Sequence, residues 1–378
     1  MPHTLHDYIY SDRPVLGLHI TSFTNSTIVT LSWPHVVGGG LGIKEIISAW
    51  SKALRTDGDL PALLGAREDV LDGIGTDIDS PPPYCLEPSQ IKGWRFVKLA
   101  LRLLWNVVRR PEVQSRTLCL PGHFVSRLKE AALRELDDAH QGDETSFISE
   151  NDVMEAWASR FVAQVRGGQR SALVVTSLDI RSRVNALWDT GGVYVQNTAV
   201  CVYTSVDSEM LLSRPLGELS HVFRQSIQAS ATDEQIRAQL RIFRTLGHKK
   251  RIPLYGNPDS HLMSFSNWTK FDLFNAAEFS PAILSTSSTD SGAPVKPVYM
   301  HCQALGENRL LRDCFHITGK DLEGNYWITA FLYPEDWTRL EEYMVQTCQH
   351  LGRRKMSGDF SPAESPKATV HITTKYHK

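Results

Sequence analysis

The 378-residue sequence lacks the features that mark several specialised classes of protein. Its formal net charge is only −2, so no overall basic excess favours nucleic acid or an anionic membrane as a partner. Its six cysteines are scattered and form no Cys-x-x-Cys pair, which argues against a disulfide framework and a zinc knuckle. Reduced thiols in a cytoplasmic protein are the simplest interpretation.

Long hydrophobic runs are also missing. The longest apolar stretch, residues 94–108, is too short to span a bilayer and carries Arg95, Lys98 and Arg102. It predicts an amphipathic helix on the protein surface, with a helix lying on a membrane as the less favoured alternative. Residues 1–7 lack the basic flank and the apolar core of a signal peptide.

Common signatures of catalysis and ligand binding are absent as well. No Gly-x-Ser-x-Gly motif supports a hydrolase with a serine nucleophile. The glycines of residues 38–42 do not match the dinucleotide-binding fingerprint, and no phosphate-binding lysine follows them. Histidines recur near both ends of the chain, as His3 with His6 and His371 with His377, but frayed ends are poor metal sites and no metal is expected.

What remains is an ordinary globular composition, 42% hydrophobic and 22% charged, in a chain long enough for two domains. Strand and helix patterns mix along the chain, which predicts an α/β protein with a mixed sheet. Residues 56–93 predict a loop or linker, and the polar chain from Lys355 predicts a disordered tail. The expected strands are 16–20, 29–33, 116–121, 172–178, 193–195, 199–203, 261–274, 298–303 and 327–332. The expected helices are 41–55, 94–110, 123–137, 150–165 behind the capping box Ser149-x-x-Asp152, 215–246, and one that begins at Glu335.

The most informative segment is the glycine-rich turn around His35. The β-branched run 27–31 predicts a strand that leads into this turn, and a helical pattern follows at once. A histidine at the end of a rigid strand suits a general base, because the glycines allow a substrate to approach the backbone closely. The alternative is a histidine that only hydrogen-bonds within its own turn, and spacing alone does not decide between the two.

Two later segments supply further polar groups. Asp179, Arg181 and Arg183 directly follow a buried strand, so they form either a solvated strand end or an arginine held against the His35 turn. Ser266 lies two residues before Trp268, so both side chains point to the same side of a strand. Ser266 can then donate a hydrogen bond to a developing oxyanion. A polar strand face with a core tryptophan is the alternative that this segment alone favours.

Taken together and in this order, the segments resemble the BAHD acyltransferase superfamily, most closely its fungal branch of trichothecene-type O-acetyltransferases. The family has a strand followed by His-x-x-x-Asp-Gly, which reads here as His35-Val36-Val37-Gly38-Gly39-Gly40. The family's helix start, Ser/Thr-x-x-Asp followed by Ala-Trp, resembles residues 149–152 followed by Ala156-Trp157.

The later motifs of the family are similar too. Its Asp-x-Arg-x-Arg strand end resembles residues 179–183, and its Gly-Asn turn resembles Gln196-Asn197. Its Thr/Ser-x-Trp segment resembles Ser266-Asn267-Trp268, whereas its Asp-Phe-Gly-Trp-Gly loop is recognisable only weakly at residues 278–282. The resemblance covers almost the whole chain.

The resemblance implies the two-domain, chloramphenicol-acetyltransferase-like α/β fold with mixed sheets, with the active site in a channel between the domains. Acyl-CoA and a small-molecule alcohol would enter from opposite sides of a monomer that needs no cofactor beyond this co-substrate. His35 would remove the proton of the attacking alcohol, and Ser266 would help to hold the tetrahedral oxyanion. The residues implied to support the site are Gly39, Gly40, Arg181, Arg183, Asn197 and Trp268.

The sequence departs from the family at two points. The family's aspartate pairs with an arginine, whereas this chain has Gly39, so Arg181 or Arg183 is expected to lack its partner and the loop that aims His35 is expected to be looser. Family members also carry a longer segment before the histidine, so the N-terminal domain is expected to be truncated.

The expected organisation is a remnant of the N-terminal acyltransferase domain (1–80), a crossover linker with the amphipathic helix (81–115), a C-terminal acyltransferase domain (116–354) and a polar tail (355–378). The leading hypothesis is an acyl-CoA-dependent O-acyltransferase that acts on a hydroxylated secondary metabolite. The alternatives are a catalytically impaired relative that serves as a binding or accessory protein, and a CoA-independent dehydratase or cyclase on the same scaffold. Neither nucleic acid nor a membrane span is expected.

Overall fold

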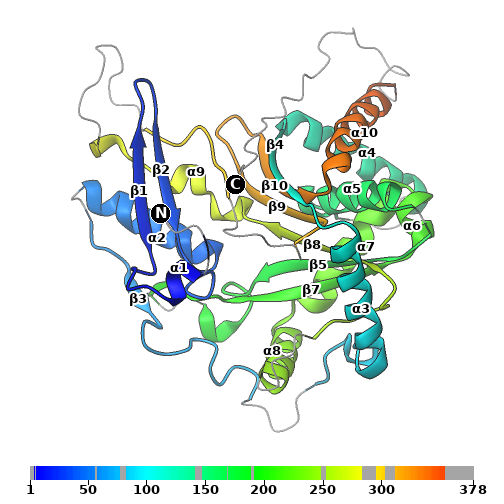
Figure 1. Cartoon of the computed structure of the whole chain (residues 1–378), viewed down its shortest axis with the longest axis horizontal. Coiled ribbons are helices and arrows are strands. Elements are labelled where there is room, and N and C mark those ends of the chain that lie inside the picture. Colours follow the sequence, from blue (N-terminus) through cyan, green and yellow to red (C-terminus); the bar gives the residue numbers. More distant parts are fainter. Residues whose placement is uncertain are drawn as a thin grey trace.

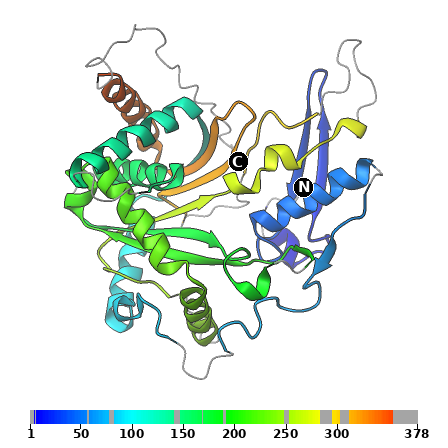
Figure 2. The same ribbon diagram turned by 180° about the vertical axis from the view of Figure 1, so that it is seen from behind.

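The computed structural model describes residues 4, 6–55, 58–76, 82–140, 147–167, 169–188, 191–247, 253–282, 295–302 and 311–353. A large part contains a six-stranded sheet, and a smaller part contains an N-terminal hairpin and one long helix (Figures 1 and 2). The α/β architecture with mixed sheets is confirmed. The domain boundaries stay a prediction, and the polar tail lies outside the described residues.

The central sheet is mixed in direction. Strand β10 is antiparallel to both β4 and β9, strand β8 is parallel to both β9 and β5, and β5 is antiparallel to β7. The sheet is covered on both faces, since Val174 of β5 belongs to the main core and its neighbour Leu173 belongs to a second cluster. The order across the sheet is β4 (Gln114–Leu120), β10 (Tyr326–Leu332), β9 (Cys314–Lys320), β8 (His261–Asn267), β5 (Ala172–Asp179) and β7 (Ala199–Val206).

Helices form the layers on the two faces of this sheet (Figure 1). The main core gathers around large buried side chains such as Trp157, Phe161 and Trp337. The helices that contribute to it are α4 (Gly122–His140), α5 (Glu150–Val165), α6 (Ser208–Leu212), α7 (Leu216–Ser230) and α10 (Pro334–Arg353). Helix α8 (Asp233–Gly247) packs on the other face, where Tyr84, Tyr203 and Tyr255 meet edge to face.

The smaller part has little core of its own. Strands β1 (Gly17–Ser22) and β2 (Thr27–Ser32) form an antiparallel hairpin, and α2 (Gly40–Arg55) follows it. The short strand β3 (Ala62–Leu64) pairs in parallel with β6 (Gly192–Tyr194), which ties this part to the larger one. The remaining elements are α1 (His6–Ile9), η1 (Glu87–Ser89), α3 (Gly93–Arg109), η2 (Asn185–Leu187), η3 (Thr269–Phe271), α9 (Leu273–Ala276) and η4 (Ser280–Ala282).

The structure corrects several expected elements. The long helix expected at 215–246 is two helices, because Thr232 accepts the Gln235 N–H and starts α8 anew. The strand expected at 261–274 ends at Asn267, and residues 298–302 form no strand. Strand β9 was not predicted at all.

Candidate active site

His35 stands at the tip of a tight turn. The Val37 N–H donates to the Pro34 carbonyl at 3.0 Å, and the Trp33 indole N–H closes the turn on the Gly38 carbonyl at 3.1 Å. The Ile43 N–H donates to the Gly39 carbonyl at 3.1 Å as α2 begins. The turn is built locally from strand end to helix start and leaves the His35 side chain exposed.

The glycines of this turn let it dock closely on the larger part of the molecule. A Cβ atom on Gly42 would lie 2.1 Å from the Val195 carbonyl oxygen, and one on Gly38 would lie 2.7 Å from the same oxygen. A Cβ atom on Gly40 would lie 2.5 Å from Cε2 of Trp268. Side chains at these positions would separate the start of α2 from its supports, so the glycine run is a packing requirement.

Asn197 joins this turn directly. Its Nδ2 donates to the His35 carbonyl oxygen at 2.7 Å. A Cβ atom on Gly39 would lie 2.9 Å from Asn197 Oδ1, so the amide fills the space beside the position where the family carries aspartate. Asn197, which the family resemblance implied as a supporting residue, thus holds the turn through a hydrogen bond to its backbone.

The expectation that Gly39 leaves an arginine without a partner is wrong for Arg181. Its guanidinium pairs with Asp179, two residues earlier in the same motif, and donates to the carbonyls of Tyr194 at 3.1 Å and Gln196 at 2.8 Å. Arg181 thus holds the segment on which the glycines pack. Arg183 makes no side-chain hydrogen bond within the described residues, and desolvation followed by repulsion from Arg224 lowers its pKa.

Ser266 and His316 lie side by side. They are register partners on the parallel strands β8 and β9, and the Trp268 ring meets the His316 imidazole edge to face at 4.2 Å between centroids. The His316 Nε2 atom is buried and has no partner among the described residues. Burial, and then the charge of nearby His35, lower the pKa of His316 to about 4, so this imidazole is neutral at pH 7.

The expected site residues thus fall into two groups. One group meets at the turn and contains His35, Gly39, Gly40 and Asn197. The other contains Ser266, which lies near the end of β8, and Trp268, which follows that strand and packs against Gly40. No hydrogen bond joins Ser266 to His35 within the described residues. The sequence missed His316 because β9 itself was missed.

A chain of polar side chains, which ends at the buried Glu155, supports the Ser266–Trp268 segment. Asn267 Nδ2 donates to Asn151 Oδ1 at 2.6 Å, and Asn151 Nδ2 donates to Glu155 at 2.8 Å. Thr176 donates to the other Glu155 oxygen at 3.2 Å. Complete burial raises the pKa of Glu155 to about 8, so this carboxyl group is largely protonated at neutral pH.

The weakly recognised loop at 278–282 also contacts the turn's helix. Glu278 pairs with Arg55 at the end of α2 at 3.2 Å, and its N–H donates to Ser51 Oγ at 3.0 Å. Trp50 and Phe279 meet edge to face at 5.0 Å. This loop therefore contacts the C-terminal part of α2, while Trp268 packs against its start.

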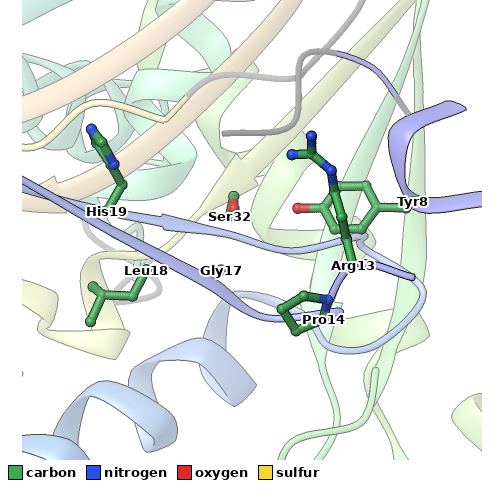
Figure 3. Close-up of a pocket in the computed structure, with 7 residues that line it drawn as sticks. All are labelled: Tyr8, Arg13, Pro14, Gly17, Leu18, His19 and Ser32. Atoms are coloured by element: carbon green, nitrogen blue, oxygen red, sulfur yellow. The ribbon is translucent and has the colours of Figure 1, made fainter. Parts of the chain in front are cut away.

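A separate pocket lies beside the hairpin and does not include His35 or Ser266 (Figure 3). Its lining residues are Tyr8, Arg13, Pro14, Gly17, Leu18, His19 and Ser32. In the part of the chain that is described, no group of three or more histidine, cysteine or acidic residues is arranged to hold a metal ion. No described helix is long and apolar enough to cross a bilayer. All six cysteines are free thiols.

Comparisons with known proteins identify a family and relatives of this chain. Residues 1–281 match the family model described as the Transferase family. The acetyltransferase pyiB of Pyricularia grisea is 56% identical over 355 residues, which are 93% of this chain and 70% of that protein. The O-acetyltransferase PaAT-2 of Phomopsis amygdali is 32% identical over 361 residues, which are 91% of this chain and 72% of that protein.

Among solved structures, the fold is similar to that of TRI101 from F. sporotrichioides in complex with coenzyme A and T-2. The TM-score is 0.59 at 18% sequence identity, and the match covers 89% of this chain and 71% of TRI101. At this identity the likeness establishes the shared fold.

Proposed function

Because the chain belongs to the Transferase family of BAHD acyltransferases and is itself an acyltransferase, we propose that it moves an acyl group from acyl-CoA to a hydroxyl group of a secondary metabolite, with His35 as the general base. The names of its relatives support acetyl as the acyl group and oxygen as the acceptor atom. The observation that carries the proposal is the docking of the His35 turn, through Gly40 and Trp268, on the strand end that holds Ser266 and His316.

In the proposed reaction His35 removes the proton of the acceptor hydroxyl while the oxygen attacks the thioester carbonyl. An alcohol is too weak an acid to ionise near neutral pH, so a positioned base is the main requirement. The tetrahedral intermediate then collapses as its carbon–sulfur bond breaks. His35 returns the proton to the departing thiolate, and an ester and CoA are released. This direct transfer needs no serine or cysteine nucleophile.

The developing oxyanion needs hydrogen-bond donors that are already in place. We infer that the Ser266 hydroxyl is one donor and that the neutral imidazole of His316 is a second. Their adjacent positions on β8 and β9 support a shared target, and the unpartnered Nε2 of His316 is free to donate in its N–H tautomer. Asn197 and Arg181 are positioning residues, because they contact the backbone that carries His35 or supports it.

Release of free thiol from acetyl-CoA, measured with purified chain and a panel of hydroxylated fungal metabolites, tests the function. Thiol release that depends on an acceptor is expected. His35→Ala should lower it by at least about 100-fold, whereas His19→Ala, an exposed histidine of the hairpin, should leave it unchanged.

Three results would count against parts of the proposal. Equal turnover by wild type and His35→Ala would remove His35 from its role. A folded chain that binds CoA by calorimetry but acylates no acceptor would favour the accessory-protein alternative, and one that does not bind CoA would favour CoA-independent chemistry. A cytoplasmic location and a monomeric state stay predictions of the sequence.

A further inference from the structure

Helix α3 (Gly93–Arg109) carries its apolar face outward. Only Leu99 of this helix is fully buried, whereas Trp94 is 72% exposed and Trp105 is 61% exposed. Helical periodicity places further apolar side chains on the same face as the two tryptophans. These side chains, each between 45% and 66% exposed, are Val97, Leu101, Leu104 and Val108.

Three basic side chains attach α3 to the segment before β8, beside the buried Leu99. Arg95 donates to the Gly256 carbonyl at 2.8 Å, Lys98 pairs with Asp259 at 2.6 Å, and Arg102 donates to the Ser260 carbonyl. A surface helix normally keeps its apolar stripe against the core, whereas most of the apolar side chains of α3 face outward although Leu99 is buried. Contiguous exposed apolar surface of this kind marks an interaction site.

The charge of the helix indicates what covers it. Residues 92–110 contain no aspartate or glutamate. Their basic residues are Lys92, Arg95, Lys98, Arg102, Arg109 and Arg110. Lys92 and Arg109 are exposed at the two ends of the helix and have no ion-pair partner among the described residues. An apolar face with two tryptophans, on a helix whose charged residues are all cations, is the composition of helices that lie in the interface of an anionic bilayer.

The position of α3 allows such contact. In Figures 1 and 2 the helix lies at the periphery of the molecule, on the opposite side from the hairpin and α2. We propose that α3 is a membrane-docking helix that binds the surface of an anionic lipid bilayer through the face formed by Trp94, Leu101 and Trp105. This role is independent of the proposed acyl transfer and does not require the helix to span the membrane.

Vesicle flotation with the full chain tests the proposal. Vesicles of phosphatidylcholine with about 30% phosphatidylserine should bind the chain several-fold more than phosphatidylcholine alone, and salt should weaken the binding. The double variant Leu101→Gln/Trp105→Gln should lose at least about tenfold in binding. Lys92→Gln/Arg109→Gln should bind the anionic vesicles more weakly than the wild type but should bind phosphatidylcholine vesicles equally. The matched control Leu322→Gln/Val345→Gln, which changes two exposed apolar residues elsewhere, should bind like wild type.

Quenching of tryptophan fluorescence by brominated lipid provides a second readout that does not depend on removing the apolar face. Trp94→Phe/Trp105→Phe should still bind but should lose most of the quenching. The proposal is overturned if the wild-type chain does not bind anionic vesicles, or if the Leu101/Trp105 variant binds equally. It is also overturned if light scattering shows that α3 is covered by a second copy of the chain instead.

Discussion

The hairpin and the central sheet differ sharply in how well they are packed. Six of the seven residues of β10 are buried, whereas no residue of β1 is buried. The hairpin leads into the turn that carries His35, and the sheet carries Ser266 and His316. The proposed base therefore sits in the weakly packed part of the molecule and the proposed oxyanion donors in the strongly packed part.

The orientation of His35 therefore depends on the contacts between the two parts of the molecule, which we call the seam. The contacts at the turn itself include Asn197 with the His35 carbonyl, Val195 with the helix start, and Trp268 with Gly40. A displacement of about 1 Å can cost a large factor in rate when it moves a catalytic group. Changes at the seam should therefore reduce turnover through geometry, while changes in the sheet should act on the reaction or on stability.

The largest effect among the remaining predictions is expected for the oxyanion donor in the sheet. Ser266→Ala should lower kcat by about 100-fold or more, with KM for acetyl-CoA little changed, because the donor acts mainly in the transition state. Ser264→Ala, two residues earlier on the same side of β8, is the matched control and should keep most of the activity. Retention of a third or more of wild-type kcat in Ser266→Ala would remove the hydroxyl from the mechanism.

The second prediction concerns the stability of the seam. Gly42→Ala should destabilise the protein by about 1–3 kcal/mol, because its methyl group would lie 2.1 Å from a backbone oxygen that cannot move freely. Gly39→Ala meets only the end of the Asn197 side chain, at 2.9 Å, and should cost less. Urea unfolding measures both free energies. Equal stability of the two variants would show that the seam is more compliant than the structure indicates.

Much of this arrangement follows from local sequence. Residues close together in the chain determine the strand, turn and helix around His35, the capping box at Ser149 and the amphipathic helix near residue 100. Local periodicity and capping chemistry are sufficient to predict such elements. The partner of Arg181 is also local, but the family pattern drew attention to the missing aspartate at 39 instead of to Asp179.

The missed parts depend on contacts between distant segments. His316 became a candidate only because β9 pairs in parallel with β8, a pairing that joins residues 50 positions apart, Ser266 and His316. The β9 sequence alternates Phe315 and Ile317 with polar residues, but the run is short and its register is set by its neighbours. The outward direction of the apolar face of α3 could not be predicted from the sequence either. Periodicity indicates an amphipathic helix, but it does not show which face packs against the protein.

The third prediction separates catalysis from stability with two histidines. His316 and His261 both have a buried Nε2 without a partner among the described residues, and burial lowers the pKa of each to about 4. His316→Phe should lower kcat by about tenfold, because it removes the second donor. His261→Phe should leave kcat near the wild-type value, since His261 lies at the other end of β8.

Both histidines should affect acid stability in the same direction. In the unfolded chain each takes up a proton as the pH falls through 6.5, while in the folded protein each stays neutral until about pH 4. The free energy of unfolding of the wild-type protein therefore decreases as the pH falls from 6.5 to 4. In each phenylalanine variant, the free energy of unfolding, measured with urea, should decrease less over the same pH range than in the wild type. If His316→Phe changed acid stability but not kcat, His316 would be a structural residue only.

The smallest effect is expected at Asn197, and it is the most direct test of the seam. Asn197→Ala should lower kcat by about three- to tenfold and leave KM for acetyl-CoA unchanged, because one neutral hydrogen bond to the His35 carbonyl is lost. Asn185→Ala, at an exposed position of η2, should have no effect.

Asn197→Asp keeps the size of the side chain but removes the N–H donor, so it should behave at least as poorly as alanine. Wild-type kcat in Asn197→Asp would mean that packing, and not this hydrogen bond, holds the turn. Loss in both variants with unchanged thermal stability would show that the well-packed part of the molecule aims a base that the hairpin alone cannot hold in place.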